Sequence, residues 1–312
     1  MILPLLIALL QGAPITPSPA APAPAADAGI EITSLSAPAC PAWADRFADE
    51  ALARAVAAAA PGCEGLDQIA ALDVPLPVAS LKGIEALTGL RRLAVEDVID
   101  GDLSPLSGLK GLIELSLGPP SWDLGFDERI HVTDLSPLAS LTGLKSLRLA
   151  SAPVRSLKPL GSLKALASLA LVSAPLSGLE GLEGCVALKR LSLEGAGVRD
   201  IKPLAPLVAL ERLDLAGNRV KDLKPLAGMV ALRRLELAYN PWLSDLSPLV
   251  SLKALETLSL KATAVASVAP LLKLTKLLRV DLCQTPAAAS LGQVGGLTAD
   301  GVQVSFEGPA CQ

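Results

Sequence analysis

A leucine pattern with a period of about 22 residues runs along most of this chain. Each copy ends in L-x-x-L-x-L, as at Leu144, Leu147 and Leu149. The first residue of the final pair stands at Leu72, Leu93, Leu115, Leu147, Leu169, Leu191, Leu213, Leu235, Leu258 and Val280. The differences between successive position numbers are 21, 22, 32, 22, 22, 22, 22, 23 and 22. One more step of 22 reaches Val302, so we expect ten repeats closed by a C-terminal strand cap, Val302-Gln303-Val304.

The same pattern fixes the geometry of each copy. An L-x-L alternation forms a short strand, and a fixed period stacks such strands into one parallel sheet. The returning segment carries its own apolar ladder, as at Val154, Leu157 and Leu160, and a recurring proline that fits the first position of a short helical turn. We predict an α/β solenoid, right-handed and curved. The parallel sheet lies on the concave face and short helical or 3-10 turns lie on the convex face.

Two units of this pattern, Asp134-Leu135-Ser136-Pro137-Leu138 and Asp222-Leu223-Lys224-Pro225-Leu226, resemble the bacterial internalin-type class of leucine-rich repeat. The resemblance covers about residues 66 to 306 and implies protein recognition on the concave face. The asparagine ladder of that class is kept here only at Asn218 and Asn240. Elsewhere the column holds Val98, Pro120, Ala152, Ala174, Ala196, Thr263 and Thr285. Many turns must therefore satisfy their backbone groups in another way, and we expect local irregularity.

The chain divides into four segments by composition. Residues 1–12 contain the apolar stretch Ile2 to Leu10, which we interpret as a signal-peptide core because it is too short to span a bilayer. Residues 13–39 are a Pro/Ala-rich spacer. Residues 40–65 are expected to form an N-terminal capping helix that begins at Pro41 and buries Phe47 and Leu52. Residues 66–312 form the leucine-rich repeat domain with its C-terminal cap.

Five cysteines bear on the cellular compartment. Cys40 and Cys63 bracket the expected capping helix, and Cys283 and Cys311 lie at the C-terminal end, so we expect one disulfide at each end and a free Cys185. Together with the signal-like stretch, these pairs predict a secreted or periplasmic protein. The alternative is a cytoplasmic protein with reduced cysteines.

Charge and motif content narrow the function classes. The net charge of −4 offers no attraction for nucleic acid, and the chain has a single histidine. Phosphate-binding loops, Cys/His metal spacings and nucleophile elbows are missing from the sequence, so we expect no enzyme, no cofactor and no metal. Asp123, Asp127 and Glu128 do not fit a calcium loop. The recurring Asp134, Asp200, Asp222 and Asp245 are expected to be turn or cap residues.

The residues beside the strand leucines should lie on the concave face. One column contains Arg190, Arg212, Arg234 and Arg279, and the next contains Asp214 and Glu236. Because neighbouring strands are about 4.8 Å apart, the arginines would stack as like charges unless Asp214 and Glu236 separate them. Two interpretations stay open, a solvated and mutually paired charge ladder or an electrostatic docking strip for a protein.

Aromatic residues gather at two interruptions of the template. The longest step of the series inserts about ten residues between Leu117 and Val132, with Trp122, Phe126 and His131 in this segment. A second departure, five repeats later, carries Tyr239 and Trp242 on the same edge. Each ring either packs over a neighbouring turn or contributes to a two-point aromatic contact beside the arginines.

These observations predict a non-catalytic protein-binding scaffold, secreted or periplasmic, that uses the concave face of a leucine-rich repeat array. The partner is an unidentified protein, with no nucleic acid and no integral membrane span, and the chain is expected to be a monomer. One alternative is an intracellular regulatory subunit that docks on an enzyme. Another is a surface-glycan binder that uses Trp122 and Trp242. A third, an enzyme built on the Asp123 loop, is disfavoured by the single histidine.

Overall fold

The computed structural model describes residues 46–60, 65–118, 130–306 and 311. The chain divides into two compact units, Met1–Ala37 and Pro38–Gln312, and all described residues belong to the second. None of the helices within these ranges is long and apolar enough to cross a membrane.

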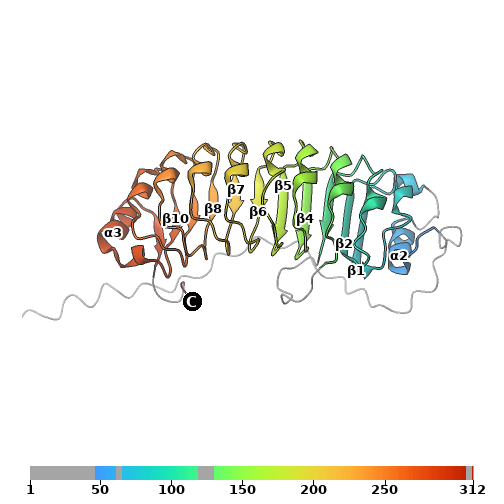
Figure 1. Ribbon diagram of the computed structural model, residues 1–312, viewed down its shortest axis with the longest axis horizontal. Helices are drawn as coiled ribbons and strands as arrows, with labels where there is room; N and C mark the ends of the chain where they lie inside the picture. The colour runs from blue at the N-terminus through green and yellow to red at the C-terminus, as the bar shows by residue number, and fades with distance from the viewer. Residues whose placement is uncertain (1–45, 61–64, 119–129, 307–310, 312) are drawn as a thin grey trace, which may run out of the picture. The chain divides into compact units, whose positions relative to one another are not determined.

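The repeats form one parallel sheet whose eleven strands follow one another in chain order (Figure 1). The strands are β1 (Ala71–Val78), β2 (Arg92–Val98), β3 (Glu114–Leu117), β4 (Ser146–Ala150), β5 (Ser168–Val172), β6 (Arg190–Ser192), β7 (Arg212–Asp214), β8 (Arg234–Glu236), β9 (Thr257–Ser259), β10 (Arg279–Asp281) and β11 (Gln303–Ser305). The predicted leucine-rich repeat solenoid is therefore confirmed.

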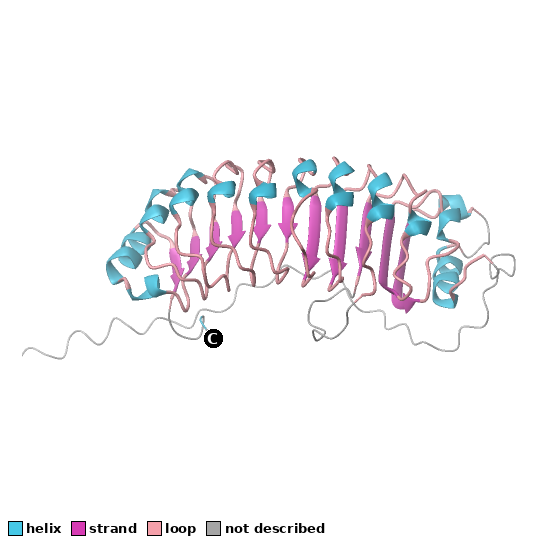
Figure 2. Ribbon diagram, in the orientation of Figure 1, coloured by secondary structure: helices cyan, strands magenta, loops and turns pink. Residues whose placement is uncertain are grey.

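Short 3-10 helices form a second row beside the strands (Figure 2). They span Leu66–Gln68, Ile84–Ala86, Ser104–Leu106, Ser136–Ser140, Lys158–Ser162, Leu182–Gly184, Lys202–Leu204, Lys224–Leu226, Ser247–Ser251, Ala269–Lys273 and Pro286–Ala289. Most have the recurring proline as their second residue, where its nitrogen needs no hydrogen bond. An aspartate before most of these proline turns accepts from the backbone N–H two residues on, as Asp200 does from Lys202 at 2.9 Å and Asp245 from Ser247 at 2.8 Å.

The register of the sheet follows the leucine series for ten strands. Leu72 pairs with Leu93, and each later member pairs with the next as far as Val280. Leu115 pairs directly with Leu147 although the longest step of the series lies between them, so the inserted residues lie outside the sheet. These inward leucines are almost completely buried and form one continuous core with the ladder of the returning segments.

The C-terminal end departs from the expected spacing. Val280 pairs with Val304 and not with Val302, so the strand cap is shifted toward the C-terminus. Helix α3 (Leu291–Ala299) lies between the last 3-10 turn and β11, and it buries Val294 and Leu297 against the core. An α-helical turn takes more residues than a 3-10 turn, which explains the longer step.

Helix α2 (Glu50–Ala59) covers the N-terminal end of the array. Its Asp49 cap accepts the Leu52 N–H through Oδ1 at 2.9 Å, while its Oδ2 accepts the N–H of Ala79, next to β1, at 2.7 Å. Leu52 and Val56 are fully buried. The helix therefore occupies the later part of the segment expected to be helical, and residues 46–49 before it are not helical.

The two asparagines of the ladder join successive turns. The amide oxygen of Asn240 accepts from Val220 N–H at 2.8 Å, and its nitrogen donates to the carbonyls of Leu215 and Leu237 at 2.9 Å each. Asn218 makes the equivalent bonds one repeat earlier. Where alanine replaces asparagine, the chain compensates locally, since the amide of Leu176 bonds to Ala174 O at 2.8 Å in a γ-turn-like contact. This is the irregularity expected from the incomplete ladder.

Candidate functional site

Three arginines lie in register on the exposed face of the sheet. Arg190 pairs with Arg212 and Arg212 with Arg234 across β6, β7 and β8, and all three side chains are exposed. Strand spacing places neighbouring members about 4.8 Å apart at the backbone. Arg279 stands further along the same column, separated from Arg234 by Thr257. We call Arg190, Arg212 and Arg234 the arginine column.

In the described part of the chain, the arginine column forms no ion pair with the acids of the neighbouring column, although Arg234 acts on Glu236 at longer range. Within the described ranges no ion pair joins Arg190, Arg212 or Arg234 to Asp214 or Glu236. The acids belong to the next column, where Asp214 Oδ1 accepts from Ala216 N–H at 3.0 Å and Oδ2 from Ser192 Oγ at 3.3 Å.

Ion pairs on this part of the molecule form instead one position before the arginine column. Lys189 Nζ lies 3.4 Å from Glu211 Oε1, and Arg233 Nε donates to Glu256 Oε1 at 2.8 Å. Charges are therefore paired on this face, but the pairs are formed by Lys189, Glu211, Arg233 and Glu256. Pairing of the arginine column itself is one of the two interpretations that the sequence leaves open.

The column beside the arginine column contains the acids Asp214, Glu236 and Asp281, and their carboxylates repel one another. We call it the acidic column. Burial raises the pKa of the Glu236 carboxyl, and the nearby carboxylates of Asp214 and Asp281 raise it further, while a hydrogen bond with Ser259 and the charge of Arg234 lower it. Burial and then Asp214 also raise the pKa of Glu194. The sheet face over β6 to β8 thus has a cationic column beside an acidic one, and the charges within each column favour partners from outside.

Three exposed valines accompany the arginine column. Val186, Val208 and Val230 occupy one position in three successive repeats, four residues before Arg190, Arg212 and Arg234, and are 51%, 52% and 60% exposed. Sequence reasoning missed them because each looks like a member of the apolar pattern. The available signal is that other repeats place Lys or Thr there, as at Lys110, Thr142, Lys164 and Lys253.

Tyr239 and Trp242 lie on the edge of the sheet that follows β8. Tyr239 has a left-handed backbone, with a φ of 57°, at the turn position where the two preceding repeats have Gly195 and Gly217. Tyr239 is 52% exposed, and Lys261 Nζ lies 5.8 Å from the centre of its ring. Trp242 is 58% exposed and lines a separate cavity that does not include Tyr239. The two rings are both exposed, as a recognition role requires.

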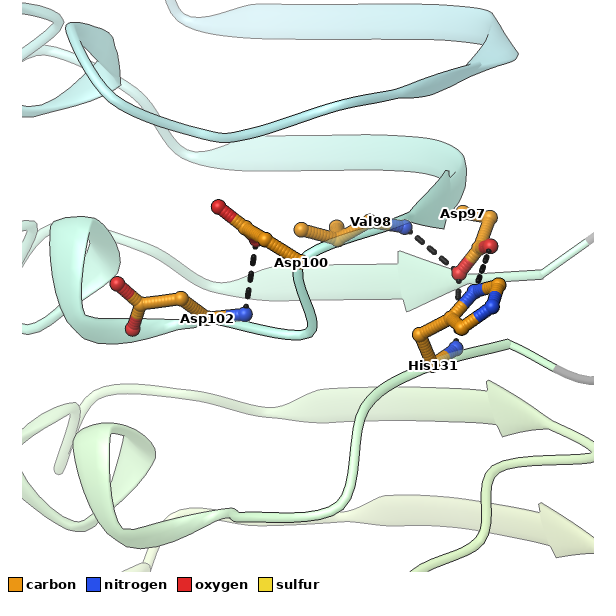
Figure 3. Close-up of polar contacts among 5 residues, drawn as sticks. All are labelled: Asp97, Val98, Asp100, Asp102 and His131. Carbon is orange, nitrogen blue, oxygen red and sulfur yellow. Dashed lines mark hydrogen bonds and ion pairs between the residues drawn. The ribbon is translucent and has the colours of Figure 1, made fainter.

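The insertion after β3 returns to the array at His131, which is fixed by Asp97 at the end of β2 (Figure 3). Asp97 Oδ1 accepts from the backbone N–H of both Val98 and His131, at 2.7 Å and 3.0 Å. Asp97 Oδ2 lies 2.7 Å from His131 Nδ1. The histidine thus has a structural partner. Trp122 and Phe126 lie outside the described residues.

Cysteine chemistry differs between the two ends of the chain. Cys283 and Cys311 form a disulfide with their Cα atoms 5.2 Å apart. Cys40 and Cys63 lie outside the described residues. Cys185 is free and buried, and burial raises the pKa of its thiol to about 11. Among the residues that the structure describes, no group of three or more His, Cys, Asp or Glu side chains could hold a metal ion.

Comparisons with known proteins agree with this geometry. A family model described as leucine rich repeats, in two copies, matches residues 208–251. An internalin (inlF) of Listeria monocytogenes is 25% identical with a TM-score of 0.61, and the match covers 86% of this chain and 92% of that one. Internalin C2 of the same organism is 29% identical with a TM-score of 0.57, covering 80% of this chain and 99% of that one.

A leucine-rich repeat protein of Leptospira interrogans shares the fold at 20% identity, with a TM-score of 0.60 over 72% of this chain and 56% of that one. A search of curated protein sequences gave no match. The regular register of the repeats, the 3-10 row and these similarities lead to one conclusion. The chain is a leucine-rich repeat solenoid that is similar to the internalins.

Proposed function

We propose that this chain is a non-catalytic protein-binding scaffold whose partner docks on the exposed sheet face across β6, β7 and β8. The observation that carries the proposal is the arginine column, three exposed guanidinium groups in register that form no ion pair among the described residues. Like charges stacked at strand spacing oppose folding unless they are neutralised from outside. A partner's carboxylates would supply that neutralisation.

The surroundings of the column define the chemistry of the partner. Guanidinium groups bind carboxylates through paired, charge-assisted hydrogen bonds, which favours an acidic segment facing Arg190, Arg212 and Arg234. The exposed valines beside them favour aliphatic side chains flanking those acids. Asp214 and Glu236 in the next column favour a basic group on the other side of the same segment.

We further propose that the protein is exported and works in the periplasm or outside the cell. The Cys283–Cys311 disulfide supports this location, because cytosolic thiols are kept reduced. Mass spectrometry of the protein from its native host, without reductant, tests it. A mature N-terminus after the apolar leader together with an intact Cys283–Cys311 bond is expected. Retention of Met1 with free thiols throughout would contradict the proposal and favour the intracellular regulator.

The docking face is tested by comparing two charge-matched variants. In the first, Arg190, Arg212 and Arg234 are replaced by serine. In the second, Lys158, Lys202 and Lys224 are replaced by serine, which removes the same charge from the row of 3-10 helices. Each purified protein is used to capture binding partners from the native host and its environment, and candidates are then measured directly by calorimetry.

A protein that binds the wild type and the lysine variant but not the arginine variant is the expected result. Its affinity should also fall as salt is added, because exposed charges on this face are screened. Equal binding to the arginine variant, after both variants are shown to fold, contradicts docking on this face.

A further inference from the structure

Trp242 is exposed because its repeat contains one extra residue. Asp222 follows Asn218 by four positions in the preceding repeat, whereas Asp245 follows Asn240 by five. The inward position held by Val220 in the first repeat is held by Leu243 in the second, and both are fully buried. The additional residue, Trp242, is therefore placed outside the core with 58% of its surface exposed. An indole left in water forgoes the burial that large aromatic side chains normally gain.

Three cations surround this indole. Arg199, Arg219, Lys221 and Trp242 line a cavity of about 280 Å³. Arg199 and Lys221 occupy one position in two successive repeats, and Arg219 stands where the neighbouring repeats have Gly197 and Pro241. Stacking of the repeats brings side chains from separate turns to a spacing of about 5 Å, so these three cationic side chains line one cavity with Trp242.

The cations lack acid partners in the described part of the chain. None of Arg199, Arg219 and Lys221 takes part in an ion pair there. The nearby aspartates are committed to turns, since Asp200 accepts from Lys202 N–H at 2.9 Å and Asp222 from Lys224 N–H at 2.9 Å. Asp200 also pairs with Lys202 Nζ at 3.7 Å. The lining of the cavity is mostly apolar, and the three side chains that line it together with Trp242 carry positive charge.

A second cavity adjoins the first and has a different character. It measures about 370 Å³ and shares Arg199 and Arg219, but it is also lined by Ser177, Glu180 and Asp200. Carboxylate and hydroxyl oxygens accept hydrogen bonds from the hydroxyl groups of a ligand. They repel a ligand that is acidic throughout its length.

We propose that the Trp242 cavity binds an anionic sugar unit of a polysaccharide, a uronic acid or a sulfated sugar. The sugar ring lies on the indole, and its carboxylate or sulfate is bound by Arg199, Arg219 and Lys221. A neighbouring sugar unit occupies the second cavity, where Ser177, Glu180 and Asp200 accept its hydroxyl groups. The site is separate from the arginine column and does not depend on the function proposed above.

An acidic peptide fits these two cavities less well than a sugar. Its carboxylates would meet Glu180 and Asp200 in the second cavity, and it brings no ring to the indole in the first. A folded protein surface needs an interface of about 1,000 Å² or more, whereas a cavity of this size holds one ring with its acid group.

Isothermal titration calorimetry on the full-length protein tests the proposal with four probes. A hyaluronan tetrasaccharide, with a uronic acid on alternate units, and a keratan sulfate tetrasaccharide, sulfated only on its glucosamine units, represent the two kinds of anionic sugar with an uncharged neighbouring unit. A neutral maltotetraose tests the need for charge, and a tetraglutamate peptide tests the need for a ring. Trp242→Ala and Arg199→Gln remove the two parts of the site. Tyr239→Ala and Arg155→Gln are the matched controls, an exposed ring and a cation of the same column that do not line either cavity.

At least one anionic oligosaccharide should bind, and Trp242→Ala and Arg199→Gln should each weaken it by about tenfold or more, the loss expected for one charge-assisted contact. The controls should change the affinity by less than about twofold. Three results would each overturn the proposal. They are no binding of either anionic probe, binding of maltotetraose or tetraglutamate as tight as that of the anionic sugars, and an affinity unchanged by Trp242→Ala.

Discussion

Replacing Asn240 by alanine should destabilise the array more than any single exposed substitution. Asn240 is fully buried, and its side-chain amide makes three short hydrogen bonds, to Val220 N–H at 2.8 Å and to the carbonyls of Leu215 and Leu237 at 2.9 Å. Two of the three connect its repeat to the one before. A buried neutral hydrogen bond contributes about 1 kcal/mol net, so Asn240→Ala should lower the free energy of unfolding by about 3 kcal/mol.

Thr263→Ala provides the matched control for that measurement. Thr263 occupies the same column, but its hydroxyl makes one bond, to the Leu260 carbonyl of its own repeat at 2.7 Å. Its loss should cost about 1 kcal/mol. Urea denaturation of the oxidised protein, followed by circular dichroism, gives both values. If Asn240→Ala is no more destabilising than Thr263→Ala, the hydrogen bonds of Asn240 to the preceding repeat add nothing measurable to the free energy of unfolding.

Three further changes test other parts of the structure. Ala262 has a left-handed backbone with a φ of 55°, so Ala262→Gly should stabilise the protein by roughly 0.5 to 1 kcal/mol in urea denaturation, and a loss of stability would contradict this. Because burial raises the pKa of Glu236, its contribution to stability is present at low pH and is lost as the pH rises through that pKa. Glu236→Gln should therefore gain stability over the wild type as the pH rises above the ordinary pKa of a glutamate, and parallel pH curves for the two proteins would refute the assignment. Reduction of the Cys283–Cys311 bond, which spans 28 residues, should lower stability by about 3.5 kcal/mol, and an unchanged urea midpoint would show that the bond does not constrain the unfolded chain.

The candidate sites could be predicted only in part. The sequence singled out the arginine column, Tyr239 and Trp242, because a strict period makes each departure from the template visible. It did not single out Arg199, Arg219 and Lys221, which belong to two successive repeats and look like ordinary exposed cations. They become neighbours of Trp242 only when the turns stack.

Charge pairing could not be predicted from the columns alone. Lys189 and Arg233 form ion pairs with Glu211 and Glu256, whereas the adjacent arginine column forms none among the described residues. The sequence places both sets beside acids. Side-chain reach and burial decide which of two adjacent columns pairs, and the half-buried Asp214 and Glu236 are held by their own hydrogen bonds and surroundings.

The sequence by itself determined the solenoid and the register of its first ten strands, because a constant period allows only one way of stacking Leu72 through Val280 in parallel. The tertiary structure decided the arrangement of two places where the chain departs from the repeat period. At the C-terminal end α3 replaces a short turn, so β11 pairs Val304 with Val280. At Trp242 the fully buried Leu243 fills the inward position, so the extra residue of that repeat is exposed in a cavity that it lines with three cationic side chains. Packing against neighbouring turns, which no single repeat encodes, is the physical reason in both places.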